Sequence, residues 1–248
     1  MTLDFAAFVA EATADPAVVG LVLKGSQAHE GMANSHSDHD LYVILADDTA
    51  SELTALQGYR SARLDLVVTT LERFPQLADW DRYAIARSRV LLDRSDGEVT
   101  RIVAAMGRLG EEEAFRSAAA LLDAYANLLY RSVKNHRDGN PLAGHLDAAA
   151  SVGFLLDLLF ALDRRPRPYN KYLAWELDRF PLPGWESTAL LDTIARITAT
   201  GEAAPQQRLF ARVEAAARAA GHGAVLDAWG EDLALMRPNP DSPAHQHF

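Results

Sequence analysis

Short apolar runs separated by polar stretches fill the first hundred residues of this 248-residue chain. Runs of strand length, rich in Val, Leu and Ile, occupy residues 18–24, 41–45, 63–68 and 88–93. The run LYVIL at 41–45 is apolar on both faces, which is typical of a strand buried in the middle of a sheet. An amphipathic helix is predicted over residues 3–14, and short helices over 50–58 and within 74–86. The pattern predicts a small mixed sheet with flanking helices.

From about Glu98 the β-branched runs stop, and Ala and Leu recur at steps of three and four residues. We predict an α+β protein with an α/β domain over 1–108, an all-α helical bundle over 109–237 and a flexible tail over 238–248. Pro-containing breaks lie at 164–168 and 181–184. Helices of the bundle are predicted over 111–137, 143–162, 170–179, 186–200, 204–220 and 223–236.

Polar residues at the strand ends carry the candidate chemistry. Gly25 and Ser26 follow the first strand, and Asp38 and Asp40 open the second. Because side chains alternate along a strand, Asp38 and Asp40 share one face and His39 lies on the other. Two carboxylates that close together repel each other unless a cation neutralises them, and oxygen ligands favour Mg²⁺. The backbone N–H groups and the hydroxyl of the Gly-Ser turn could bind phosphate oxygens.

A third carboxylate, Asp65, lies in the strand at 63–68. If this strand pairs beside the second, Asp65 joins Asp38 and Asp40, and the three could hold two metal ions roughly 3.5–4 Å apart for displacement at phosphorus. Taken alone, the Gly-Ser pair is more typical of an ordinary turn, and the Asp-His-Asp segment is more typical of a solvated strand entry with capping aspartates. The combination of turn, spacing and third acid favours a site.

These residues resemble a known family. Gly25-Ser26, Asp38-x-Asp40 and the later Asp65 are similar to the motif of the nucleotidyltransferase superfamily, which includes DNA polymerase beta and the antibiotic nucleotidyltransferases. The resemblance covers about residues 18–95. It implies that Gly25 and Ser26 bind the β- and γ-phosphates of a nucleotide, that Asp38 and Asp40 ligate Mg²⁺, and that Asp65 is a metal ligand or the base.

The helical half resembles the antibiotic enzymes more weakly, through the stretch RPYNKYL at 167–173. In related enzymes a lysine of the helical domain reaches the triphosphate, which makes Lys171 the candidate; a surface lysine at a helix start is the alternative. The resemblance implies two Mg²⁺ ions, an NTP co-substrate with ATP expected, and a small-molecule hydroxyl acceptor of aminoglycoside type. Asp65, or Asp123, Asp147 or Glu176 from the bundle, could be the general base.

Composition narrows the partners. The absence of cysteine excludes disulfides, thiolate metal sites and cysteine nucleophiles, and suits a reducing cytoplasm. With 24 basic and 34 acidic residues, a net charge of −10 and no basic stripe, a long nucleic acid is not expected as partner. The acidic surface would attract a cationic acceptor, or it serves only solubility.

The N-terminus does not read as a signal peptide, and the apolar run at 154–162 is too short to cross a bilayer. The sequence predicts a cytoplasmic protein without membrane partner, and a homodimer is compatible with it.

Two other functions stay open at this point. The chain could be an antitoxin-type enzyme that transfers AMP to a protein, or a nucleotide-binding regulator without catalysis. Arg131 and His136 also resemble the R-x4-H ribonuclease motif of HEPN domains. Residues five apart lie about 140° around a helix rather than above one another, so we favour a solvated helix face for this pair.

Overall fold

The computed structural model describes residues 3–239, with the side chains of residues 79 and 80 excepted. The chain divides into two compact units, Met1–Arg108 and Leu109–Phe248, which are described one at a time. Most of the predicted tail, residues 240–248, lies outside the described residues.

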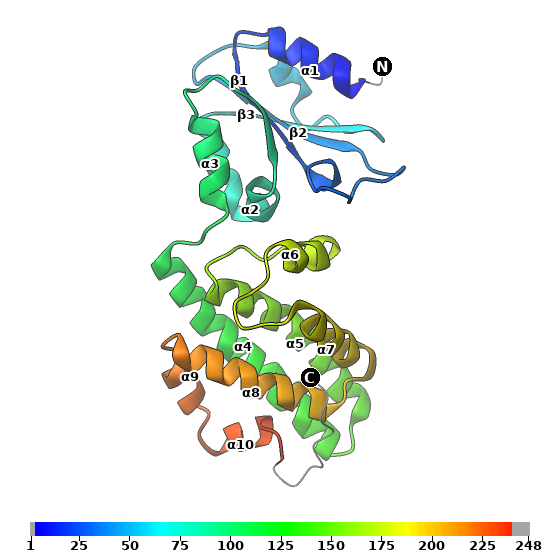
Figure 1. Cartoon of the computed structure of the whole chain (residues 1–248), viewed down its shortest axis with the longest axis vertical. Helices are drawn as coiled ribbons and strands as arrows, with labels where there is room; N and C mark the ends of the chain where they lie inside the picture. The colour runs from blue at the N-terminus through cyan, green and yellow to red at the C-terminus, as the bar shows by residue number, and fades with distance from the viewer. Residues whose placement is uncertain (1–2, 240–248) are drawn as a thin grey trace. The chain divides into compact units, whose positions relative to one another are not determined.

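A four-stranded sheet organises the first unit (Figure 1). Its strands are β1 (Val18–Lys24), β2 (His39–Leu45), β3 (Leu64–Thr70) and β4 (Arg89–Asp93), in the order β3-β2-β1-β4. β1 pairs antiparallel with both β2 and β4, whereas β2 and β3 run parallel. The predicted mixed sheet is therefore confirmed, and the strand predicted to be buried on both faces is one of the two central strands.

Helices cover both faces of this sheet. Helix α1 (Phe5–Ala14) packs on one face, where β2 contributes Leu41, Val43 and Leu45. Helices α2 (Ala78–Ala86) and α3 (Glu98–Met106) pack on the other, where β2 contributes Tyr42 and Ile44. The alternation places Asp40 on the α2 and α3 face. Three 3₁₀ turns lie in the connections: η1 (Gly25–Gln27), η2 (Glu52–Leu56) and η3 (Phe74–Leu77). The helix predicted over 50–58 is thus a short 3₁₀ turn.

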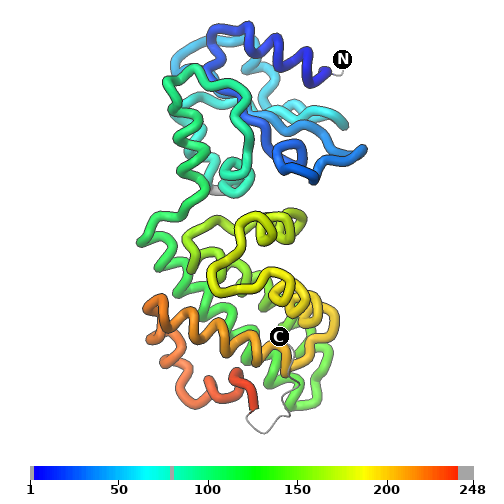
Figure 2. Tube along the Cα trace, viewed as in Figure 1, coloured from blue at the N-terminus to red at the C-terminus, as the bar shows by residue number. Residues whose placement is uncertain are grey.

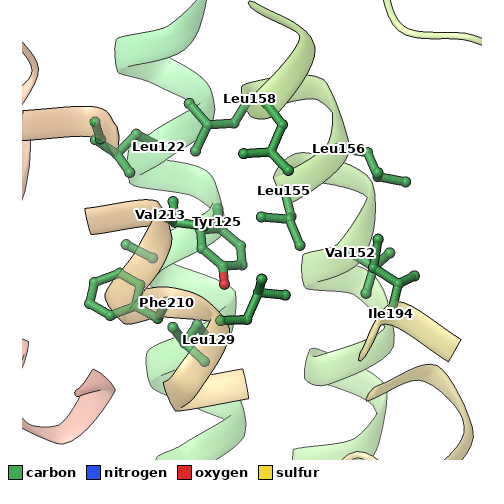
Figure 3. Packing of buried hydrophobic residues seen from close by; sticks show 14 of the residues in the cluster. Leu122, Tyr125, Leu129, Val152, Leu155, Leu156, Leu158, Ile194, Phe210 and Val213 are labelled. Atoms are coloured by element: carbon green, nitrogen blue, oxygen red, sulfur yellow. The ribbon is translucent and has the colours of Figure 1, made fainter. Parts of the chain in front are cut away.

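Between residues 109 and 239, the described part of the second unit, the regular elements are helices joined by loops (Figure 2). Its two long helices, α4 and α5, pack against each other, and their residues form a core with α8. Figure 3 labels residues of this core, among them Leu122, Tyr125 and Leu129 of α4, Leu155 of α5 and Phe210 of α8. The helical elements are α4 (Glu111–Arg137), α5 (Pro141–Leu162), η4 (Asn170–Tyr172), α6 (Leu173–Arg179), α7 (Ser187–Thr200), α8 (Ala203–Ala219), α9 (Gly223–Asp227), η5 (Gly230–Asp232) and α10 (Leu233–Met236).

One predicted helix of this unit is wrong. The stretch predicted as a single helix over 223–236 is divided into α9, η5 and α10. Gly230 has a φ of +53°, a left-handed conformation that is incompatible with a continuous right-handed helix.

Helix α5 is long and apolar enough to cross a membrane by length and composition. However, 56% of its apolar window is buried inside the unit. The packing of α5 as a core helix accounts for its hydropathy.

Candidate functional site

Three carboxylates meet where β2 and β3 begin. In the parallel pairing of these strands Asp40 lies directly opposite Asp65. Asp38 precedes Asp40 by two positions and so points to the same face. One carboxylate oxygen of each of Asp38, Asp40 and Asp65 lies within 4.8 Å of the other two, and all three residues are half-buried. The structure thus brings together the three acids that the sequence singled out, and their role as metal ligands stays a prediction.

The negative charges of these acids act on each other. Burial raises the pKa of Asp40 most, and the charge of Asp38 raises it further. Asp65 and the buried Asp81 add to this effect, whereas the neighbouring Lys24 opposes it. A divalent cation would relieve the repulsion, and a donor set made only of carboxylates fits a hard ion such as Mg²⁺ or Mn²⁺.

The turn that follows β1 is fitted against one of these acids. Gly25 has a φ of +70°, in the left-handed region, and a Cβ built on it would overlap Oδ2 of Asp40. Only glycine satisfies both constraints. Gly25 and Ser26 open the 3₁₀ turn η1, whose first N–H groups have no acceptor within the turn. The turn therefore lies directly beside Asp40, the place where an oligophosphate site would need its N–H donors.

A buried histidine that we did not predict fixes this turn. Nδ1 of His29 donates to the carbonyl of Gly25 at 2.7 Å, and the N–H of Ala28 donates to the same oxygen at 3.1 Å. With Nδ1 protonated, Nε2 of the neutral ring accepts from the hydroxyl of Tyr83 at 3.3 Å. Because Tyr83 lies on α2, this contact ties the turn to the helix that covers the same face of the sheet.

Asp65 and Asp40 line a pocket of about 270 Å³, and two basic residues, Lys24 and Arg60, line it as well. Arg60 lies 3.8 Å from Asp65, between Nε and Oδ2, but its side chain is 84% exposed. The N–H of Ser61 donates to Asp65 Oδ1 at 3.2 Å. Residues 60–61 therefore contact Asp65 from the outer edge of β3 and help to position it. The other lining residues are Gln57, Gly58, Leu66, Val67 and Leu77.

His39 takes no part in this cluster. Its ring stacks on Phe5 of α1, with the ring centroids 3.9 Å apart and the planes at 14°. The prediction that His39 lies on the opposite face from the two aspartates is confirmed.

Lys171 belongs to the second unit. It lies in η4, just before α6, so the predicted helix start is a 3₁₀ turn. The side chain is exposed, and Nζ lies 5.3 Å from the ring centroid of Tyr172. Its contact with a nucleotide stays a prediction.

The remaining candidates of the bundle have contacts within that unit. Arg131 pairs with Asp147 at 3.4 Å, and Asp147 also accepts from Asn135 at 3.0 Å. His136 is not on a solvated face as predicted, because its ring is half-buried against Gly144. Asp123 accepts from the indole N–H of Trp229 at 3.1 Å. Glu176 is fully buried and pairs with Arg165 at 3.3 Å. These contacts connect the helices of the bundle.

Comparison with known proteins finds distant likeness among solved structures. No family model matches the chain, and no curated protein matches it. Among solved structures, the chain is similar to a nucleotidyltransferase-like protein from Exiguobacterium sibiricum 255-15, with 15% sequence identity and a TM-score of 0.43. The match covers 91% of this chain and 75% of that chain. Because the TM-score is this low, the function proposed below depends on the geometry of the site.

Proposed function

We propose that this chain is a Mg²⁺-dependent nucleotidyltransferase that moves a nucleoside monophosphate from an NTP to a hydroxyl group. ATP is the expected donor, and a small molecule of aminoglycoside type is the expected acceptor. The observation that supports this proposal is the convergence of Asp38, Asp40 and Asp65 beside a Gly-Ser turn that is built against Asp40.

Each residue has a task that follows from its place. Asp38, Asp40 and Asp65 would hold the metal ions, which would neutralise the negative charge that develops on oxygen during the transfer. The N–H groups of the turn at Gly25 and Ser26 orient the outer phosphates, and His29 keeps the turn in place. Asp65 is the metal ligand or the base that takes the proton of the acceptor.

The reaction balances without a further reagent. The acceptor hydroxyl attacks the α-phosphorus in line, and its proton passes to the base. The bond from the α-phosphorus to the bridging oxygen breaks, and pyrophosphate leaves. Positioning and electrostatic stabilisation account for most of the rate, because no covalent enzyme intermediate is needed.

The test uses ATP carrying radioactive phosphorus at the α or the γ position, with Mg²⁺ and a panel of hydroxyl acceptors. The α label should pass to the acceptor and the γ label should appear in pyrophosphate. Asp65→Asn should lower the rate by roughly 100-fold or more, because it removes one carboxylate from the metal site. Asp48→Asn, a change at an exposed aspartate of the same unit, should leave the rate unchanged.

Other outcomes separate the remaining functions. An α label found on a protein-sized product would indicate the protein-modifying alternative, with the same chemistry and a different acceptor. Transfer of the γ label, or transfer that Asp65→Asn leaves intact, would contradict the nucleotidyltransferase proposal. So would calorimetry that finds no Mg²⁺-dependent binding of ATP.

A further inference from the structure

Lys24 lies next to both parts of the proposed site, the acidic cluster and the turn at Gly25. It is the last residue of β1 and directly precedes Gly25. In the antiparallel pairing of β1 and β2 it is opposite Asp40, so both side chains point to the same face of the sheet. Its side chain is 15% exposed and lines the pocket that contains Asp40 and Asp65. A lysine therefore lies beside the proposed metal ligands and at the start of the phosphate-binding turn.

Buried groups hold this lysine in place. Its ammonium forms an ion pair with the carboxylate of Asp81, which is 3% exposed, and the hydroxyl of Tyr42 donates to the same oxygen. The ammonium also lies 4.7 Å from the ring centroid of Tyr42. Asp81 is the residue at which α2 is kinked, with φ −128° and ψ 17°. These contacts hold the ammonium in place and limit the conformational freedom of the flexible lysine side chain.

The chemistry of the pocket indicates an anion as its ligand. At a site that binds only metal ions, the ammonium of Lys24 helps to keep Asp40 ionised but repels the divalent cations themselves. A lysine beside three acids is favourable where the ligand carries negative charge and bridges metal and ammonium, as an oligophosphate does. The alternative is that Lys24 only compensates the charge of the acids. The two possibilities differ in what loss of the ammonium does to nucleotide binding.

We propose that Lys24 is a substrate-binding residue whose ammonium contacts a phosphate oxygen of the nucleotide, and that Asp81 and Tyr42 are the residues that position it. This inference rests on the function proposed above and adds a phosphate contact from the first unit that the family motif does not contain.

Calorimetry on the full chain tests the inference with three ligands: Mn²⁺ alone, an α,β-methylene ATP analogue with Mg²⁺, and adenosine. Lys24→Met should weaken binding of the analogue by about 10- to 100-fold, the loss expected for one charge-assisted hydrogen bond. Affinity for Mn²⁺ alone should stay equal or rise, because a repelling charge is gone. Affinity for adenosine should not change, and Lys24→Arg should retain part of the affinity for the analogue.

Lys134→Met is the matched control. Lys134 also lies over a tyrosine ring, at 5.7 Å from Tyr130, but it belongs to the helical unit. Its loss should leave all three affinities unchanged. If Lys24→Met is not folded by circular dichroism, Tyr42→Phe takes its place, since it removes only the hydroxyl that donates to Asp81. This variant should weaken binding of the analogue by a few-fold and leave Mn²⁺ binding unchanged.

Equal binding of the analogue by the wild type and Lys24→Met would overturn the inference and leave the proposed function standing. A variant that loses Mn²⁺ and analogue affinity together would also overturn it, because Lys24 would then only support the acids. A wild type that binds no analogue in the presence of Mg²⁺ would overturn the proposed function itself.

Discussion

Gly25 shows how closely a single residue can be tied to the proposed chemistry. Its φ of +70° favours glycine by backbone sterics alone, and the carboxylate of Asp40 lies where a Cβ would be. Any side chain at this position must displace Asp40 or distort the turn. The backbone conformation and the position of the Asp40 carboxylate therefore both disfavour a Cβ at residue 25.

Gly25→Ala tests this coupling. The change should destabilise the first unit by about 1–3 kcal/mol and weaken Mn²⁺ binding by at least about 10-fold, because Asp40 must move. Gly31→Ala is the control: Gly31 also has a positive φ, +78°, but nothing lies within 4 Å of its added Cβ. It should show the backbone penalty without the loss of Mn²⁺ affinity. Equal Mn²⁺ affinities for both variants would contradict the coupling.

The residues that could be found from the sequence are those with local signals. Gly25, Ser26, Asp38 and Asp40 are close in sequence, and Asp65 required only the assumption that β3 pairs with β2. His29 and Lys24 were missed for a physical reason. The places of His29 and Lys24 in the site depend on contacts with Tyr83 and Asp81, which lie 54 and 57 residues away in the sequence. No periodicity in the sequence indicates such contacts.

Among the elements, the parallel pairing of β2 with β3 and the antiparallel pairing with β1 decide the electrostatics of the site. The first pairing places Asp65 opposite Asp40, and the second places Lys24 opposite it.

In the metal-free protein, burial and the charge of Asp38 raise the pKa of Asp40. The folded protein therefore binds this proton more tightly than the unfolded chain does. The resulting stability is fully present below the ordinary pKa of aspartate, and it is lost as the pH rises through the raised pKa.

Asp40→Asn should consequently be more stable than the wild type at neutral pH in the presence of EDTA. The expected gain is a rise of a few degrees in the melting temperature, on the order of what 1 kcal/mol gives a domain of about 100 residues. The difference should shrink on acidification, when the wild-type carboxyl also becomes neutral. The rise in melting temperature that Mn²⁺ gives the wild type should be absent from the variant. A variant that is less stable in EDTA, or that Mn²⁺ still stabilises, would contradict the assignment.

Elements with uninterrupted patterns were predicted well. The apolar runs gave the four strands, and the long periodic segment gave α4 over residues 111–137. The failures lie where one residue or a short turn overrides the pattern. Gly230 divides the segment over 223–236, and the short segments at 50–58 and 170–172 form 3₁₀ turns. Periodicity does not distinguish a 3₁₀ turn from one turn of α-helix.

At the scale of the whole molecule, the described residues of the two units form separate hydrophobic cores. The core cluster around α4, α5 and α8 contains only residues of the second unit, and the two clusters on the faces of the sheet contain only residues of the first. The fold class was predictable because each half has its own pattern: short apolar runs of strand length in the first half, and apolar residues at steps of three and four in the bundle. Separate cores imply that a defect in one leaves the site in the other intact.

Leu129→Ala tests this independence. Leu129 is fully buried in the core shown in Figure 3, so its truncation should destabilise the helical unit by about 2–5 kcal/mol, measured by urea unfolding with circular dichroism. At a temperature at which circular dichroism shows both units folded, Mn²⁺ affinity should equal that of the wild type, because all three candidate ligands belong to the first unit. Leu146→Ala, on the same bundle but 64% exposed, should change the stability by less than about 0.5 kcal/mol. If Leu129→Ala weakens Mn²⁺ binding and Leu146→Ala does not, the core of the bundle supports the acidic site, and the independence of the two units is contradicted.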